Sequence, residues 1–99
     1  MDRWHAMTAF ARVVETGSFA RAAERLGVSV LSVSRLVADL EAHLDARLLN
    51  RTTRRLSLTE SGQAFFERCV QLLADLEEAE VAVTAASITR STIRSLRTA

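Results

Sequence analysis

The side chains of this chain that could do chemistry are arginines and threonines, concentrated in the segment NRTTRRLSLTESG at residues 50–62. Arginine brings positive charge and threonine brings a hydroxyl donor, and both groups bind phosphate oxygens. The segment therefore predicts a surface that grips nucleic-acid phosphates, with five contact residues: Arg51, Thr52, Thr53, Arg54 and Arg55. The alternative is a basic, solvated turn in which Arg51 or Arg55 pairs with nearby acids. We expect such pairing for at least one of the three arginines.

The distribution of charge along the chain favours a nucleic-acid partner. The net charge of +1 divides into +3 for residues 1–59, −5 for residues 60–86 and +3 for residues 87–99. Such asymmetry separates a region that faces nucleic acid from a solvated acidic one.

A phosphate-binding segment needs a scaffold, and the preceding residues fit a helix-turn-helix, in which two short helices cross closely. Helices are predicted over 2–16, 19–26 and 30–44, because Gly17 and Gly27 suit helix ends and Ser18 and Ser29 suit N-caps. The crossing needs small and apolar residues and a turn that tolerates positive φ, and seven residues meet these needs: Ala22, Ala23, Leu26, Gly27, Val28, Val33 and Leu36. An ordinary pair of packed helices would also favour alanine and glycine here.

The outward face of the third predicted helix is expected to enter the major groove of DNA. Its expected contact residues lie at its leading end and along its polar face: Ser29, Val30, Leu31, Ser32, Ser34 and Arg35. Arg35 could bind guanine through two hydrogen bonds or bind a phosphate, and Leu31 could contact a thymine methyl group. The alternatives are an ion pair between Arg35 and Asp39 and packing of Leu31 against its own fold.

Two more elements are predicted after the third helix. Residues 48–51 and 55–58 predict a small β-hairpin, and Thr59 is expected to cap a helix over residues 60–86. Apolar residues recur on that helix in alternating steps of four and three, which is typical of a coiled-coil seam: Phe65, Cys69, Leu72, Leu76, Ala79, Val83 and Ala86. Such a helix is about 40 Å long, so we expect a second copy to cover it. Packing on the first helix could account for Phe65, Phe66 and Cys69 alone.

Other kinds of site are not expected. The single cysteine, Cys69, excludes an internal disulfide and a cysteine-based zinc site, and His5 and His43 have no second ligand at metal spacing. No nucleophile–base pair, glycine-rich phosphate loop or pair of catalytic carboxylates appears, so we expect neither an enzyme nor a cofactor. No signal region or run of ~18 apolar residues appears. We therefore expect no membrane partner and a cytoplasmic location.

Residues 1–86 together resemble the N-terminal DNA-binding domain of LysR-type transcriptional regulators. The matching segments are MDRWHAMTAFARVVETGSFARAAERLGVS, SVSRLVADLEAHL and ARLLNRTTRRLSLTESG, in this order. The resemblance implies a mostly α, winged helix-turn-helix fold with a two-stranded β-hairpin wing and a long C-terminal linker helix. It implies that a homodimer binds double-stranded DNA, with each recognition helix in a major groove and each wing near the minor groove. It also implies phosphate contacts at Ser18 and Phe19.

The chain departs from the family in three places. Family members often carry Gln or Pro where this chain has Val30 and Leu31, which predicts an altered operator preference. The family usually has glycine at the position of Asp45. These 99 residues do not include the effector-binding domain that normally follows, so we expect either a fragment or shortened product, or a regulator without that domain, and no small-molecule effector site in this chain. We divide the chain into a DNA-binding domain (1–59), a linker and dimerisation helix (60–86) and a tail or hinge (87–99).

The function expected from these observations is sequence-specific binding of an inverted-repeat operator by a dimer, which in a full-length form could assemble further. The rival hypothesis is a helical interaction protein that pairs with full-length regulators through residues 65–86 without binding DNA specifically. A different family of winged-helix regulator is a lesser third hypothesis.

Overall fold

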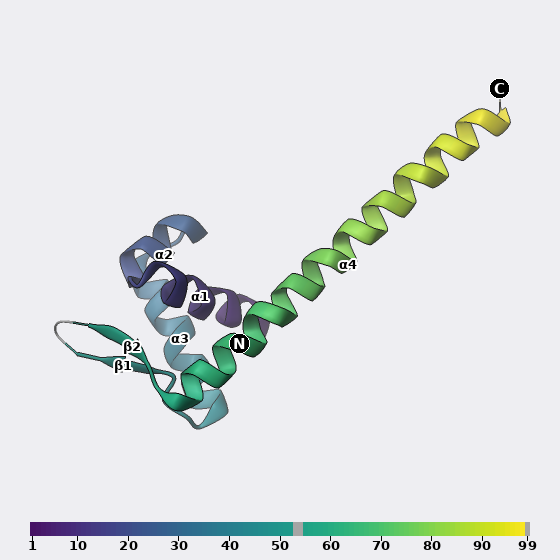
Figure 1. Ribbon diagram of the computed structural model, residues 1–99. Coiled ribbons are helices and arrows are strands. Elements are labelled where there is room, and N and C mark those ends of the chain that lie inside the picture. Colours follow the sequence, from purple (N-terminus) through teal and green to yellow (C-terminus); the bar gives the residue numbers. More distant parts are fainter. Residues whose placement is uncertain (53–54, 99) are drawn as a thin grey trace.

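Three helices, a two-stranded sheet and one long helix follow one another in the computed structural model (Figure 1). The structure describes residues 1–52 and 55–98, with side chains described as far as residue 86. The elements are α1 (Arg3–Thr16), α2 (Phe19–Leu26), α3 (Val30–Leu44), β1 (Leu49–Arg51), β2 (Leu56–Leu58) and α4 (Glu60–Thr98). The fold is the predicted winged helix-turn-helix, mostly α.

The ends of the first three helices lie where the capping residues predicted them. Ser18 and Ser29 each accept a hydrogen bond from the backbone N–H three residues ahead, at 3.2 and 3.1 Å. Gly17 and Gly27 end α1 and α2 in the left-handed conformation, with φ of 70° and 68°. Asp2 is the N-cap of α1 rather than its first residue, so this helix starts one residue later than predicted.

The core lies between α1, α2, α3 and the first turns of α4. Phe10 of α1 is fully buried, and its ring centroid lies 5.9 Å from that of Phe65 and 6.3 Å from that of Phe66, both on α4. Ala22, Ala23 and Val33 are buried at the crossing of α2 and α3, as the helix-turn-helix pattern predicted. These contacts hold the base of α4 on the three-helix unit.

The hairpin is antiparallel, with Leu49 opposite Leu58 and Arg51 opposite Leu56. Each strand begins one residue later than predicted, because Leu48 and Arg55, the first residues of the two predicted strands, lie outside the three paired positions. The hydroxyl of Thr59 accepts a hydrogen bond from the N–H of Gly62 at 2.9 Å, which confirms the predicted cap of α4.

Helix α4 is longer than the sequence predicted, since it continues beyond Ala86 to Thr98. The predicted end was wrong because residues 87–98 contain no glycine or proline that would stop a helix. The molecule is accordingly 66 Å long and 25 × 22 Å across, with α4 projecting from the three-helix unit (Figure 1). A hinge role for residues 87–99 stays a prediction. The division into a DNA-binding domain (1–59) and a dimerisation helix (60–86) also stays a prediction. None of the described helices has the length and apolar character that a membrane span requires.

Candidate nucleic-acid interface

The turn between α2 and α3 holds the two helices at a fixed crossing. The N–H of Val28 donates to the backbone oxygen of Ala23 at 3.1 Å, which satisfies a carbonyl at the end of α2. Val28 packs against the core from one side of the turn, and Ala23 is buried on the other. This rigid turn leaves the opposite face of α3 free to present side chains.

The leading end of α3 is exposed and carries both hydroxyl and apolar groups. Val30 is 48% exposed and Leu31 is 58% exposed, so Leu31 does not pack against its own fold. The hydroxyls of Ser29 and Ser32 lie 2.9 Å apart and bond to each other, which leaves one hydroxyl proton of the pair available to a ligand. Ser34 is half-buried.

Arg35 lies one turn further along α3 and is exposed. The alternative of an ion pair with Asp39 is not realised: within residues 1–52 and 55–86, Arg35 makes no ion pair. Its guanidinium retains all five donors for an external acceptor such as a guanine edge or a phosphate.

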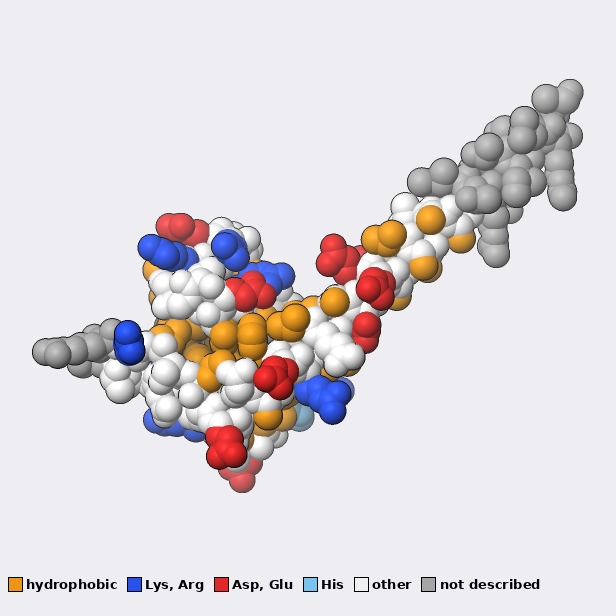
Figure 2. Space-filling model, in the orientation of Figure 1, with side chains coloured by type: hydrophobic (Ala, Val, Ile, Leu, Met, Phe, Trp, Pro, Cys, Tyr) orange, Lys and Arg blue, Asp and Glu red, His pale blue; other side chains and the backbone are white. Residues whose placement is uncertain are grey.

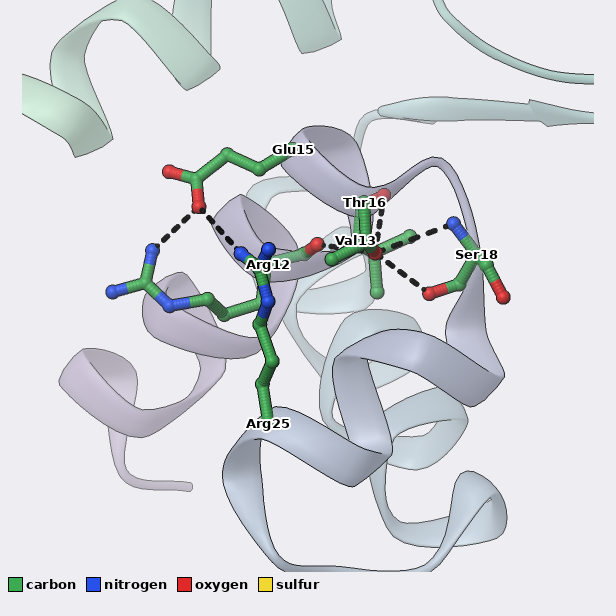
Figure 3. Close-up of polar contacts among 6 residues, drawn as sticks. All are labelled: Arg12, Val13, Glu15, Thr16, Ser18 and Arg25. Atoms are coloured by element: carbon green, nitrogen blue, oxygen red, sulfur yellow. Dashed lines mark hydrogen bonds and ion pairs between the residues drawn. The ribbon is translucent and has the colours of Figure 1, made fainter.

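The junction of α1 and α2 places Ser18 at the N-cap of α2 (Figure 3), and Phe19 follows as the first residue of this helix. The hydroxyl of Thr16 donates to the backbone oxygen of Arg12 at 2.7 Å and lies 3.4 Å from the N–H of Ser18. Glu15 holds the guanidinium groups of Arg12 and Arg25 at 2.8 and 3.9 Å (Figure 3). Arg12 and Arg25 are thereby engaged within the chain.

The wing arginines have different surroundings. Arg51 pairs with Glu41 of α3 at 3.3 Å, and its guanidinium carbon lies 5.2 Å from the ring centroid of Phe19. Arg55 is exposed and makes no ion pair with any other described residue. The predicted pairing of at least one wing arginine is therefore confirmed at Arg51.

The tip of the wing is closed by Thr52. Its hydroxyl donates to the backbone oxygen of Arg55 at 2.8 Å and accepts from the N–H of Arg55 at 3.1 Å. Its donor is thus used inside the hairpin. Thr53 and Arg54, the other predicted phosphate contacts, lie outside the described residues.

Glu41 is the residue of this surface that sequence reasoning missed. Its carboxylate accepts hydrogen bonds from the N–H of Leu48 at 2.7 Å and of Leu49 at 3.4 Å, besides the bond from Arg51. These partners lie seven, eight and ten residues away across a turn, so no helical or strand period signals them.

The predicted dimerisation seam on α4 divides into two parts. Cys69 is fully buried and Phe65 is half-buried, both within the chain's own core. Beyond them Leu72 is 44% exposed, Leu76 40% and Val83 70%, with Ala79 exposed between them. Hydrophobic side chains run as a band from the three-helix unit along α4 (Figure 2). The part of the seam that a second chain could cover therefore begins at Leu72.

Metal binding and thiol reactivity depend on titratable side chains outside this surface. No cluster of three or more His, Cys, Asp or Glu side chains able to hold a metal ion occurs in the described part of the chain. Burial raises the pKa of the Cys69 thiol from 9.0 to about 11. This shift makes Cys69 a poor nucleophile at neutral pH, since the thiolate is the reactive form.

Comparison with known proteins identifies the family of this chain. The family described as "Bacterial regulatory helix-turn-helix protein, lysR family" matches residues 4–63. An HTH-type transcriptional repressor of Pseudomonas aeruginosa is 50% identical over 99% of this chain, which spans 32% of that repressor. The chain thus spans about a third of the length of this relative.

The protein domains in two solved DNA complexes have structures similar to that of this chain. The CbnR DNA-binding domain in complex with DNA superposes with a TM-score of 0.77 at 34% identity, over 85% of this chain and 97% of the other. The BenM DNA-binding domain with catB site 1 DNA gives a TM-score of 0.79 at 28% identity, over 82% of this chain and 90% of the other. The family and these relatives are transcription regulators or their DNA-binding domains, not enzymes.

Proposed function

Because the chain belongs to the lysR family of bacterial regulatory helix-turn-helix proteins, we propose that it binds double-stranded DNA sequence-specifically through α3 and the wing. The observation that carries the proposal is the exposure of Arg35 together with its lack of an ion pair in the described residues. This side chain is on the outward face of a helix held by a helix-turn-helix. In this reading α3 enters the major groove and the wing lies near the minor groove.

The leading end of α3 reads base edges. Arg35 donates two hydrogen bonds to guanine or binds a phosphate, and a bidentate base contact provides ~1–3 kcal/mol of discrimination. Val30 and Leu31 offer apolar contact to a thymine methyl group, and Ser34 offers a hydroxyl to a base or the backbone.

Phosphate contacts orient α3 on the duplex. The N-terminus of α2 presents the backbone N–H of Phe19 and the hydroxyl of Ser18, which suits an anion. In the wing, Arg55 is available, and Thr53 and Arg54 remain proposed contacts from the sequence. Thr52 uses its hydroxyl proton inside the hairpin and contributes to the shape of the wing. Arg51 uses one N–H for Glu41 and keeps other donors for a phosphate.

The DNA-binding unit in this proposal is a homodimer. Leu72, Leu76, Ala79 and Val83 leave an apolar strip exposed on a helix that projects from the three-helix unit. A second copy that covers this strip relates two recognition helices by a two-fold axis, so the operator is an inverted repeat. Half-sites are then about 34–36 Å, or a multiple, apart. The protein acts in the bacterial cytoplasm, and a full-length form assembles further.

The same exposed strip favours a second candidate function. A helical interaction protein would use Leu72–Val83 to pair with full-length regulators and would not need Arg35. The two functions differ in whether the chain alone binds DNA specifically.

The test is binding of the purified chain to duplexes selected from a random pool, compared with unselected duplexes, over a salt series, with molecular mass measured in parallel. Salt-sensitive binding of a dimer to a two-fold-symmetric site supports the first function. A stable dimer that binds only weakly and without sequence preference supports the second.

A further inference from the structure

One carboxylate connects the recognition helix to the wing. Glu41 lies in the last turn of α3, eight residues before the first residue of β1, and its side chain is 17% exposed. One of its oxygens accepts from the N–H groups of Leu48 and Leu49, where the chain enters β1, and the other accepts from the guanidinium of Arg51. Three donors from a single short segment thus meet one side chain of α3.

Arg51 extends this connection to α2. Its guanidinium lies 5.2 Å from the ring centroid of Phe19, the first residue of α2, within the range of a cation–π contact. Phe19 is half-buried and packs against the core. The contacts from Phe19 to Arg51 and from Arg51 to Glu41 therefore link three elements: the start of α2, the first strand of the wing, and α3. These are the three elements of the proposed DNA surface.

We propose that Glu41 is a positioning residue for DNA binding: with Arg51 and Phe19 it sets the orientation of the wing relative to α3. The inference rests on the proposed function and adds to it a residue that does not itself contact DNA. We call the three residues the wing brace.

The wing needs such a brace because its sheet is small. Three residue pairs hold β1 to β2, and an isolated two-stranded hairpin is marginally stable in water. Preorganised contacts bind more tightly because less conformational freedom is lost on association. The brace holds Arg55, at the far end of the hairpin, ready for a phosphate.

The change in DNA affinity of a Glu41→Gln variant distinguishes the wing brace from a simple effect of charge. Glu41→Gln raises the net charge of the chain by one, which alone should strengthen binding to a polyanion. The brace predicts the reverse, because glutamine keeps an acceptor for Leu48 but loses the ionic partner of Arg51. Glu78→Gln is the matched control: it makes the same charge change at an exposed residue of α4 that has no ion pair within the described residues.

The experiment measures the affinity of the full chain for its selected duplex in four forms: wild type, Glu41→Gln, Arg55→Ala and the double variant, with Glu78→Gln beside them. Thermal unfolding of each form establishes that it is folded at the assay temperature. We expect Glu41→Gln to weaken binding by about fivefold to tenfold, the scale of one lost DNA contact. We expect the slope of log affinity against log salt to fall by about one, whereas Glu78→Gln binds as tightly as wild type or more tightly.

The double variant separates positioning from a loss of stability. If Glu41 acts through the wing, Arg55→Ala weakens the wild type clearly but weakens Glu41→Gln much less, since the wing contact is already lost. Equal effects of Arg55→Ala in both backgrounds, or equal affinities of Glu41→Gln and Glu78→Gln, would overturn the wing brace and leave the proposed function standing. Failure of the wild type to prefer any duplex would overturn the proposed function and the brace with it.

A readout without DNA uses amide hydrogen exchange. Glu41→Ala removes both acceptor oxygens, and we expect faster exchange at the N–H groups of Leu48 and Leu49, with that of Val37 in the core unchanged. Unchanged exchange at Leu48 and Leu49 would contradict the brace.

Discussion

Gly62, in the first turn of α4, has no room for a side chain because the backbone of Leu48 lies against it. A Cβ built at Gly62 would overlap the carbonyl oxygen of Leu48 and lie 2.8 Å from its carbonyl carbon. The same oxygen accepts a hydrogen bond from the N–H of Thr59 at 3.0 Å. The start of α4 and the entry to the wing are therefore in direct backbone contact, and the absence of a Cβ at position 62 permits it.

Gly62→Ala is expected to destabilise the protein, although alanine is normally favoured over glycine in a helix by about 1 kcal/mol. The clash is with backbone, which cannot move aside as a flexible side chain can, and overpacking of this kind costs about 1–3 kcal/mol. Urea unfolding measures the change. Ser61→Ala, at the exposed preceding position, is the control and should be neutral or slightly stabilising. A Gly62→Ala protein as stable as the wild type would contradict the close contact.

Asp45→Gly is expected to raise the free energy of unfolding by several tenths to about 1 kcal/mol. Asp45 ends α3 in the left-handed conformation, with φ of 50° and ψ of 44°, and it is the one residue other than glycine with positive φ in the described chain. Glycine adopts this conformation without steric cost. Thermal unfolding of Asp45→Gly and Asp45→Ala decides the point, because strain at this position requires glycine to be the more stable of the two.

Cys69 predicts a loss of stability in alkaline solution. Burial raises its pKa from 9.0 to about 11, so between these pH values the unfolded chain loses the thiol proton while the folded chain keeps it. The free energy of unfolding therefore falls as pH rises through this window, by up to about 1.4 kcal/mol per pH unit. The chain contains no tyrosine and no lysine, so no other side chain has an ordinary pKa in this range. Urea unfolding measured from about pH 8.5 to about pH 11 should show this fall in the free energy of unfolding for wild type and not for Cys69→Ala. The same pH dependence of the free energy of unfolding in both proteins would refute the prediction.

Leu76→Asp is expected to convert the proposed dimer to a monomer. Leu76 lies in the exposed part of the seam, and burying one leucine contributes about 1.5–3 kcal/mol. A two-fold dimer buries Leu76 from both copies, so the aspartate variant loses this contribution twice. Val81→Asp is the matched control, since Val81 is 61% exposed but lies off the seam. Sedimentation over a concentration series compares the two variants. Equal dissociation of both, or of neither, would argue against the seam.

The sequence predicted those parts of the fold that local chemistry determines. Serine caps and left-handed glycines are read one position at a time; the bounds of α2 were predicted to the residue, and the end of α3 lies at Leu44, near which it was expected. The period of the third helix placed Arg35 on its outward face, whereas for Leu31 the sequence left packing against its own fold open, and the structure exposes this side chain.

The parts that the sequence did not predict depend on contacts across turns or on missing signals. Glu41 bonds to residues that no period relates to it, and only the folded turn after α3 brings them together. The burial of Cys69 and the exposure of Leu76 were expected, because a helix of this length extends past the small domain. The residue at which exposure begins, Leu72, depends on where α4 leaves the three-helix unit, and the heptad pattern does not specify that point. The end of α4 was misplaced because serine and threonine weaken a helix without stopping it.

The most direct test of the proposed function compares Arg35→Ala with Arg68→Ala on the selected duplex and on one unrelated in sequence. Both variants remove one positive charge, but Arg35 lies on the outward face of α3 and Arg68 on α4. We expect Arg35→Ala to reduce affinity for the selected duplex about fivefold to a hundredfold and to bring it closer to that for the unrelated one, with the mass of the complexed protein unchanged. Arg68→Ala should lower both affinities slightly and equally. Identical behaviour of the two variants would contradict sequence-specific recognition through α3.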